Sequence, residues 1–144
     1  MSFKMTKSER EAFLAGVHVA VISVEDPGRG PLTMPVWYRY EPGGDVFFTT
    51  GGESRKTALI RAAGRLSLCV QTEAAPYQYV SIEGRATVET PDYEADSRAV
   101  AVRYLGERGG DAYLKSAGGG GTSTVLIRLK PERWLTVDYG KRSD

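Results

Sequence analysis

Cysteine, histidine and long apolar runs are scarce or missing in this sequence. Cys69 is the only cysteine among the 144 residues, so no disulfide can form within the chain and a reducing, cytoplasmic location is expected. His18 is the only histidine, and one histidine and one distant cysteine do not provide a set of metal ligands. No apolar run approaches the roughly 18 residues of a membrane-spanning helix, so no membrane partner is expected.

An excess of either charge is also missing. Lysine and arginine number 19 and aspartate and glutamate 18, which leaves a formal net charge of +1. This balance argues against a nucleic-acid-binding protein with a large basic surface, but it allows a small basic cluster that binds a small anion. The length suits one domain over residues 1–144, and neither an internal repeat nor a domain boundary interrupts it.

Most of the sequence is typical of short β-strands joined by tight turns. Residues 17–24 are mostly apolar and β-branched, which predicts a strand buried on both faces. Pro35 indicates that its own strand lies at a sheet edge or carries a bulge. Strands are expected over residues 17–24, 32–40, 46–50, 66–72, 79–90, 123–129 and 134–137.

Three helices are expected beside these strands. A capping box at residues 6–9 starts the first, Ser54 starts the second, and Pro91 opens a third that ends near residue 105. Residues 118–121 are all glycine and are expected to form a mobile linker. Six to seven strands with about three peripheral helices predict a mainly β fold, a closed antiparallel β-barrel. An open α+β sandwich is the alternative, but the chain offers few helices to cover open sheet edges.

One segment carries the strongest chemical signal. A strand ends in two threonines, passes two glycines and enters a helix whose first turn holds a serine, an arginine, a lysine and a threonine. A helix N-terminus offers unpaired amides and a partial positive charge, and the cations and hydroxyls add donors for a phosphate. The alternative is an N-cap serine followed by solvated cations. The candidate residues are Thr49, Thr50, Gly51, Ser54, Arg55, Lys56 and Thr57.

The order of these features resembles the pyridoxamine-phosphate-oxidase-like split barrels. The resemblance covers residues 11–88, and residues 125–134 resemble the closing strands. In that superfamily the Ser-Arg-Lys type of segment contacts the phosphate of FMN, or the corresponding phosphate of the deazaflavin coenzyme F-420. The resemblance therefore implies a split antiparallel β-barrel of six to seven strands, in which residues 54–57 hold the phosphate of such a cofactor.

Two further segments resemble parts of a cofactor site. Residues 31–38 resemble the strand that lines the flavin ring, and an apolar strand with a proline bulge can present peptide groups to a flat heterocycle. Its candidate residues are Met34, Pro35, Val36 and Trp37. The alternative for Trp37 and Tyr38 is that they pack in the core or in an interface, and this alternative is favoured for Tyr38. Tyr77 and Tyr79 lie on a strand that resembles the one contributed by a partner subunit, so they are expected to border the cofactor across a homodimer or to pack in its interface.

The resemblance implies an oxidoreductase whose cofactor supplies a hydride to a small conjugated or heteroaromatic acceptor. The sequence has no Arg-x-His type of segment like the one that true pyridoxamine-phosphate oxidases use on their substrate, so oxidation of pyridoxamine phosphate is disfavoured. F-420 is favoured over FMN because the short chain, the initial helix and the strand with Glu83 and Gly84 resemble the small deazaflavin-dependent reductases of this superfamily. An FMN-dependent enzyme and a non-catalytic flavin-binding or storage protein are the alternatives. No residue stands out as a general acid or base, and His18 and Cys69 are expected to be structural.

Overall fold

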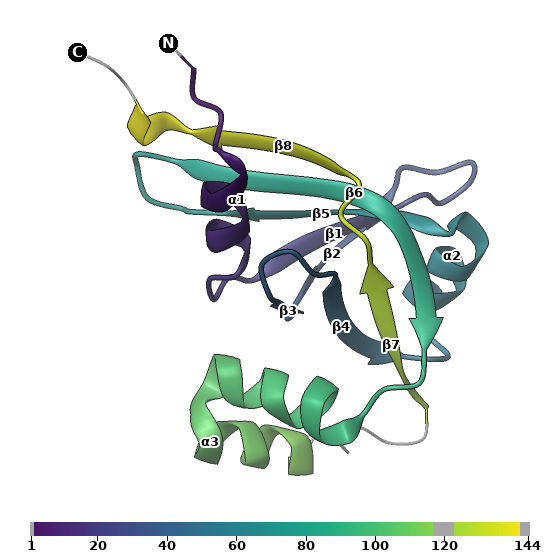
Figure 1. Cartoon of the computed structure of the whole chain (residues 1–144). Coiled ribbons are helices and arrows are strands. Elements are labelled where there is room, and N and C mark those ends of the chain that lie inside the picture. The colour runs from purple at the N-terminus through teal and green to yellow at the C-terminus, as the bar shows by residue number, and fades with distance from the viewer. Residues whose placement is uncertain (1, 117–122, 142–144) are drawn as a thin grey trace.

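In the computed structural model, which describes residues 2–116 and 123–141, an antiparallel sheet curls into a half-barrel (Figure 1). The strands are β1 (Ala20–Val24), β2 (Leu32–Val36), β3 (Arg39–Tyr40), β4 (Val46–Gly51), β5 (Arg65–Gln71), β6 (Gln78–Glu89), β7 (Thr124–Leu129) and β8 (Arg133–Asp138). The helical segments are α1 (Lys7–Leu14), α2 (Arg55–Ala63), the π-helical turn η1 (Tyr93–Arg98), α3 (Ala99–Ser116) and the short 3-10 turn η2 (Tyr139–Lys141).

The strands follow the order β2-β1-β5-β6-β7-β4-β3, with β8 beside β6. β6 is the central strand: its first half pairs with β5 and β8, and its second half bends away to pair with β7 (Figure 1). Within the described ranges β2 and β3 stand at the two ends of this order, so the sheet is a half-barrel. The mainly β split-barrel prediction is confirmed. The strands described number eight because residues 32–40 divide into β2 and β3 around Trp37 and Tyr38.

The hydrophobic core fills the concave side of the curled sheet. Alternate residues of each strand point into it, and Ile22, Leu68 and Ile82 are among those almost fully buried. Burial of each such side chain contributes about 1.5–3 kcal/mol to folding. Tyr38 is also completely buried, and its hydroxyl donates to the Leu14 carbonyl at 2.6 Å, so the packing role favoured for it is confirmed.

One sequence prediction needs correction and another is incomplete. β1 begins only at Ala20, and Val17, Val19 and Val21 are exposed, because only one face of the curled sheet meets the core. The helix after Pro91 ends near residue 105, as predicted, because Gly106 takes a positive φ of 78° and reverses the chain (Figure 1). A second helical arm, which was not predicted, then runs to Ser116 within α3.

The glycine linker predicted at 118–121 lies outside the described residues. Within the described ones, no helix is both long enough and apolar enough to cross a bilayer.

Candidate functional site

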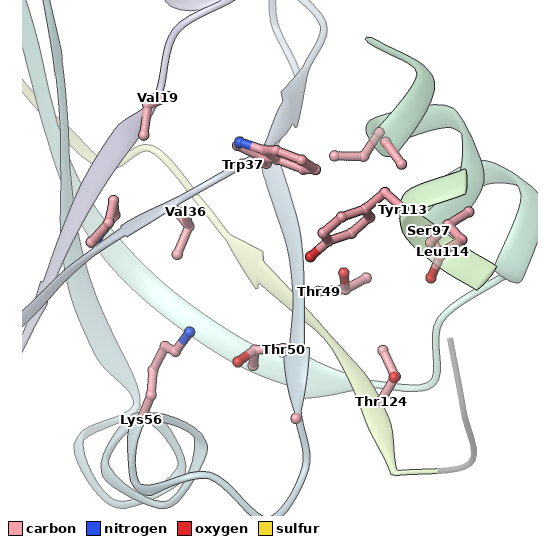
Figure 2. Close-up of a pocket in the computed structure, with 14 residues that line it drawn as sticks. Val19, Val36, Trp37, Thr49, Thr50, Lys56, Ser97, Tyr113, Leu114 and Thr124 are labelled. Carbon is pink, nitrogen blue, oxygen red and sulfur yellow. The ribbon is translucent and has the colours of Figure 1, made fainter. Parts of the chain in front are cut away.

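A cavity of about 500 Å³ opens between the end of β2, the end of β4, the start of α2 and the α3 hairpin (Figure 2). This volume lies in the range typical of cofactor and small-molecule sites. The lining residues are Val19, Pro35, Val36, Trp37, Thr49, Thr50, Gly51, Lys56, Ser97, Val100, Ala101, Tyr113, Leu114 and Thr124. Seven of the thirteen predicted cofactor contacts are therefore brought together around one cavity.

The turn between β4 and α2 is fixed by its own hydroxyl groups. The Ser54 hydroxyl accepts a hydrogen bond from the Thr57 amide at 3.2 Å and so caps α2. Thr57 is completely buried, and its hydroxyl donates to the Gly51 carbonyl at 2.7 Å. Neither residue lines the cavity, so both shape the loop that presents its neighbours.

Arg55 and Lys56 point in different directions from α2. The Arg55 guanidinium forms an ion pair with Asp26, outside the cavity. Lys56 lines the cavity, and Figure 2 shows its ammonium directed into it. Consecutive residues of a helix are about 100° apart around its axis, so adjacent side chains cannot face the same space.

The Lys56 ammonium is half-buried and forms no ion pair with the residues that the structure describes. Burial lowers the pKa of Lys56 below its ordinary value of 10.5, because desolvation disfavours the charged form. Thr49 and Thr50 line the cavity beside it and add hydroxyl groups. A partly desolvated cation with adjacent hydroxyls is a favourable setting for an anionic group.

Pro35, Val36 and Trp37 form an apolar wall of the cavity. The Trp37 ring stacks on Tyr104 of α3, with centroids 5.0 Å apart and planes 7° from parallel. The Tyr104 hydroxyl donates to the His18 carbonyl at 2.6 Å, which ties α3 to the segment before β1. Met34 lies outside the lining and packs against the hydrophobic core.

The opposite wall comes from η1 and α3, and sequence reasoning missed it. Its members are Ser97, Val100, Ala101, Tyr113 and Leu114. The buried carboxylate of Asp96 holds η1 in place by accepting from Arg39 of β3, with an Nη2–Oδ1 distance of 2.6 Å. The amphipathic pattern of residues 91–105 indicates only a packed helix, so no sequence signal pointed to a ligand there.

Tyr77 precedes β6 and Tyr79 lies at its start, and neither belongs to the cavity lining. Tyr77 is about half exposed, and its carbonyl accepts from the Tyr139 amide at 3.0 Å. Their expected role across a homodimer therefore stays a prediction. The His18 Nε2–H donates a 2.9 Å hydrogen bond to the Phe13 carbonyl, and the imidazole stacks on the Phe13 ring, as expected of a structural histidine.

Comparisons with known proteins place this geometry in context. Residues 6–138 match the sequence pattern of the pyridoxamine 5'-phosphate oxidase family. No match was found among curated proteins. The fold is similar to that of a conserved hypothetical protein from Mycobacterium tuberculosis, with a TM-score of 0.78, 18% identity, and coverage of 99% of this chain and 92% of that one.

Two other solved structures share the fold. One is described as an F420 reductase, with a TM-score of 0.69, 18% identity, and coverage of 87% of this chain and 94% of that one. The other is an FAD-binding protein from Mesorhizobium loti, with a TM-score of 0.65, 17% identity, and coverage of 92% of this chain and 94% of that one. At these identities the likeness concerns the fold alone.

Proposed function

We propose that this chain, which belongs to the pyridoxamine 5'-phosphate oxidase family, is an oxidoreductase that binds a phosphorylated flavin-type cofactor in the cavity described above. The observation that carries the proposal is the half-buried Lys56 ammonium, which points into one end of the cavity, with the Thr50 and Thr49 hydroxyls between it and the α3 wall (Figure 2). A phosphate at that end would receive a charge-assisted hydrogen bond from the lysine.

The rest of the cavity suits a flat heterocycle. Pro35 and Val36 offer an edge of sheet, and Trp37, held by its stack on Tyr104, gives a rigid aromatic surface. When bound, a flavin or deazaflavin would supply the hydride chemistry, while these residues orient the ring and exclude water. The acceptor is proposed to be a small conjugated or heteroaromatic molecule.

F-420 is proposed as the cofactor in preference to FMN. The sequence resemblance to small deazaflavin-dependent reductases supports this choice, and one solved structure of the same fold is described as an F420 reductase. The test is an optical titration of purified protein with F-420 and with FMN, followed by addition of acceptors to the reduced complex.

The proposal would be supported if F-420 binds more tightly than FMN, and if acceptors reoxidise reduced F-420 faster in the presence of the protein than in its absence. Tighter binding of FMN would support the FMN-dependent alternative. Binding without turnover across an acceptor panel would instead indicate a storage or carrier protein, and failure to bind either cofactor would remove the proposed function altogether.

A homodimer is also proposed. On the convex face of the sheet, Pro35, Val21, Cys69, Ser81 and Leu135 form a row in register across five strands. The row carries no charge, and its apolar members Val21 and Leu135 are 41% and 61% exposed. Pro35 belongs both to this row and to the cavity lining, so a second copy packed on the row would also cover the cavity mouth.

Leu135→Glu is expected to raise the dissociation constant of this dimer by about tenfold or more, because it would place a charge in a desolvated interface. Cofactor affinity should fall with it, since the cavity would lose a wall. Sedimentation equilibrium measures the first effect and cofactor titration the second. Leu105→Glu is the matched control, because Leu105 is an exposed leucine of α3 outside the row. A stable wild-type monomer with full cofactor affinity would contradict the proposal.

A further inference from the structure

Ser97 carries a buried hydroxyl without a hydrogen-bond partner in the described part of the chain. The residue is only 7% exposed, and it lines the cavity. Buried hydroxyl groups almost always have a partner, so this oxygen calls for one. Arg10 Nε and Arg103 Nε also lack a partner, but neither residue lines the cavity. Of these three residues, Ser97 alone lines the cavity.

The position of Ser97 is held firmly by its neighbours. Asp92 caps η1, and its own amide donates to the Asp96 carboxylate at 2.8 Å. Asp96 in turn is paired with Arg39 of β3. Of the wall around Ser97, Val100, Ala101 and Leu114 are apolar, and Tyr113 adds a hydroxyl that forms no hydrogen bond with Ser97.

Ser97 and Lys56 occupy opposite sides of the cavity, with Thr49 and Thr50 between them (Figure 2). One end of the cavity therefore presents a cation, and the other presents a neutral group that can donate or accept a hydrogen bond. A ligand that uses both ends needs an anionic group at one end and a neutral polar edge at the other.

We propose that the Ser97 hydroxyl binds a carbonyl or ring nitrogen at the edge of a planar heterocycle whose phosphate is held by Lys56. Ser97 is then a positioning residue: it sets how far the ring enters the cavity along the wall of Trp37. This inference rests on the proposed function and adds to it the residue that recognises the ring.

The test compares Ser97→Ala with wild type in two measurements. The first is the melting temperature of the ligand-free protein, which is expected to stay the same or rise, because the variant removes a buried hydroxyl that has no partner. The second is affinity for FMN, riboflavin, F-420 and the corresponding phosphate-free deazariboflavin. FMN and riboflavin form one pair of ligands with and without the phosphate, and F-420 and the deazariboflavin form the other. For the pair that binds, loss of one neutral hydrogen bond is expected to raise the dissociation constant by about threefold to tenfold.

The loss should be equal with and without the phosphate, because Ser97 acts on the ring. Ser8→Ala, in an exposed serine of α1, is the control and should change neither measurement. Unchanged affinity, a loss confined to the phosphorylated ligands, or a lower melting temperature of the ligand-free variant would each overturn the inference while leaving the proposed function intact. Failure of the wild-type protein to bind any of the four ligands would overturn both.

Discussion

Lys56→Ala is expected to weaken binding of the phosphorylated cofactor by about 1.5–3 kcal/mol, or about tenfold to 150-fold in the dissociation constant. Lys56 is the cation of the 54–57 segment that lines the cavity, and it forms no ion pair with the described residues. Its side chain is already partly desolvated, so a bound phosphate would gain a charge-assisted hydrogen bond at little further desolvation cost. Optical titration with F-420 and FMN measures the effect.

Two comparisons make this result specific to the phosphate. Riboflavin, which lacks the phosphate, should bind the variant and the wild type with similar affinity. Arg55→Ala removes the neighbouring cation, but Arg55 is paired with Asp26 outside the cavity, so the affinity should stay close to that of wild type. An unchanged affinity in Lys56→Ala would remove Lys56 from the site, and a large loss in Arg55→Ala would show that Arg55 leaves Asp26 to bind the cofactor.

The strands could be predicted from sequence because the signals for them are local. Alternation of apolar residues and turn-forming residues such as those at 41–45 located the strand that became β4 within one residue of its observed end. The capping box at Thr6 and Glu9 and the N-cap at Ser54 are likewise present, since each depends on residues only three positions apart. Family resemblance supplied the arrangement of strands, which local patterns do not contain.

The direction in which side chains point was harder to predict. An apolar run at residues 17–24 cannot tell a strand buried on both faces from one whose outer face is exposed, because the partner surface is not encoded nearby. The four residues 54–57 all suit a phosphate by type. Only the geometry of the loop separates Lys56, which lines the cavity, from Ser54 and Thr57, which hold the loop together.

The α3 wall could not be predicted, because its contribution depends on tertiary contacts. Ser97 comes from η1, which leads into the first arm of α3, and Leu114 comes from the second arm, after the reversal at Gly106. The ion pair of Asp96 with Arg39 joins residues 57 positions apart in the sequence, so no short motif predicts it. Sequence analysis therefore found one side of the cavity, and the structure added the other.

Gly84→Ala is expected to destabilise the protein by about 3 kcal/mol or more. Gly84 is buried at the bend of β6, where the strand changes partners from β8 to β7. The connection between β7 and β8 crosses it so closely that a Cβ at this position would lie 1.7 Å from the Lys130 carbonyl oxygen. That oxygen belongs to backbone, and the Lys130 amide donates to the Arg85 carbonyl at 2.9 Å, so the connection cannot move away without breaking the bend.

Chemical denaturation of Gly84→Ala and wild type measures this effect, with the yield of folded protein as a second reading if the variant is too unstable to titrate. Gly30→Ala is the matched control, because nothing lies within 4 Å of a Cβ there and its φ is not in the left-handed region. That control should stay close to wild type in stability. A free energy of unfolding for Gly84→Ala within about 1 kcal/mol of wild type would mean that the β7–β8 connection can shift. The curvature of the half-barrel would then not depend on the contact at Gly84.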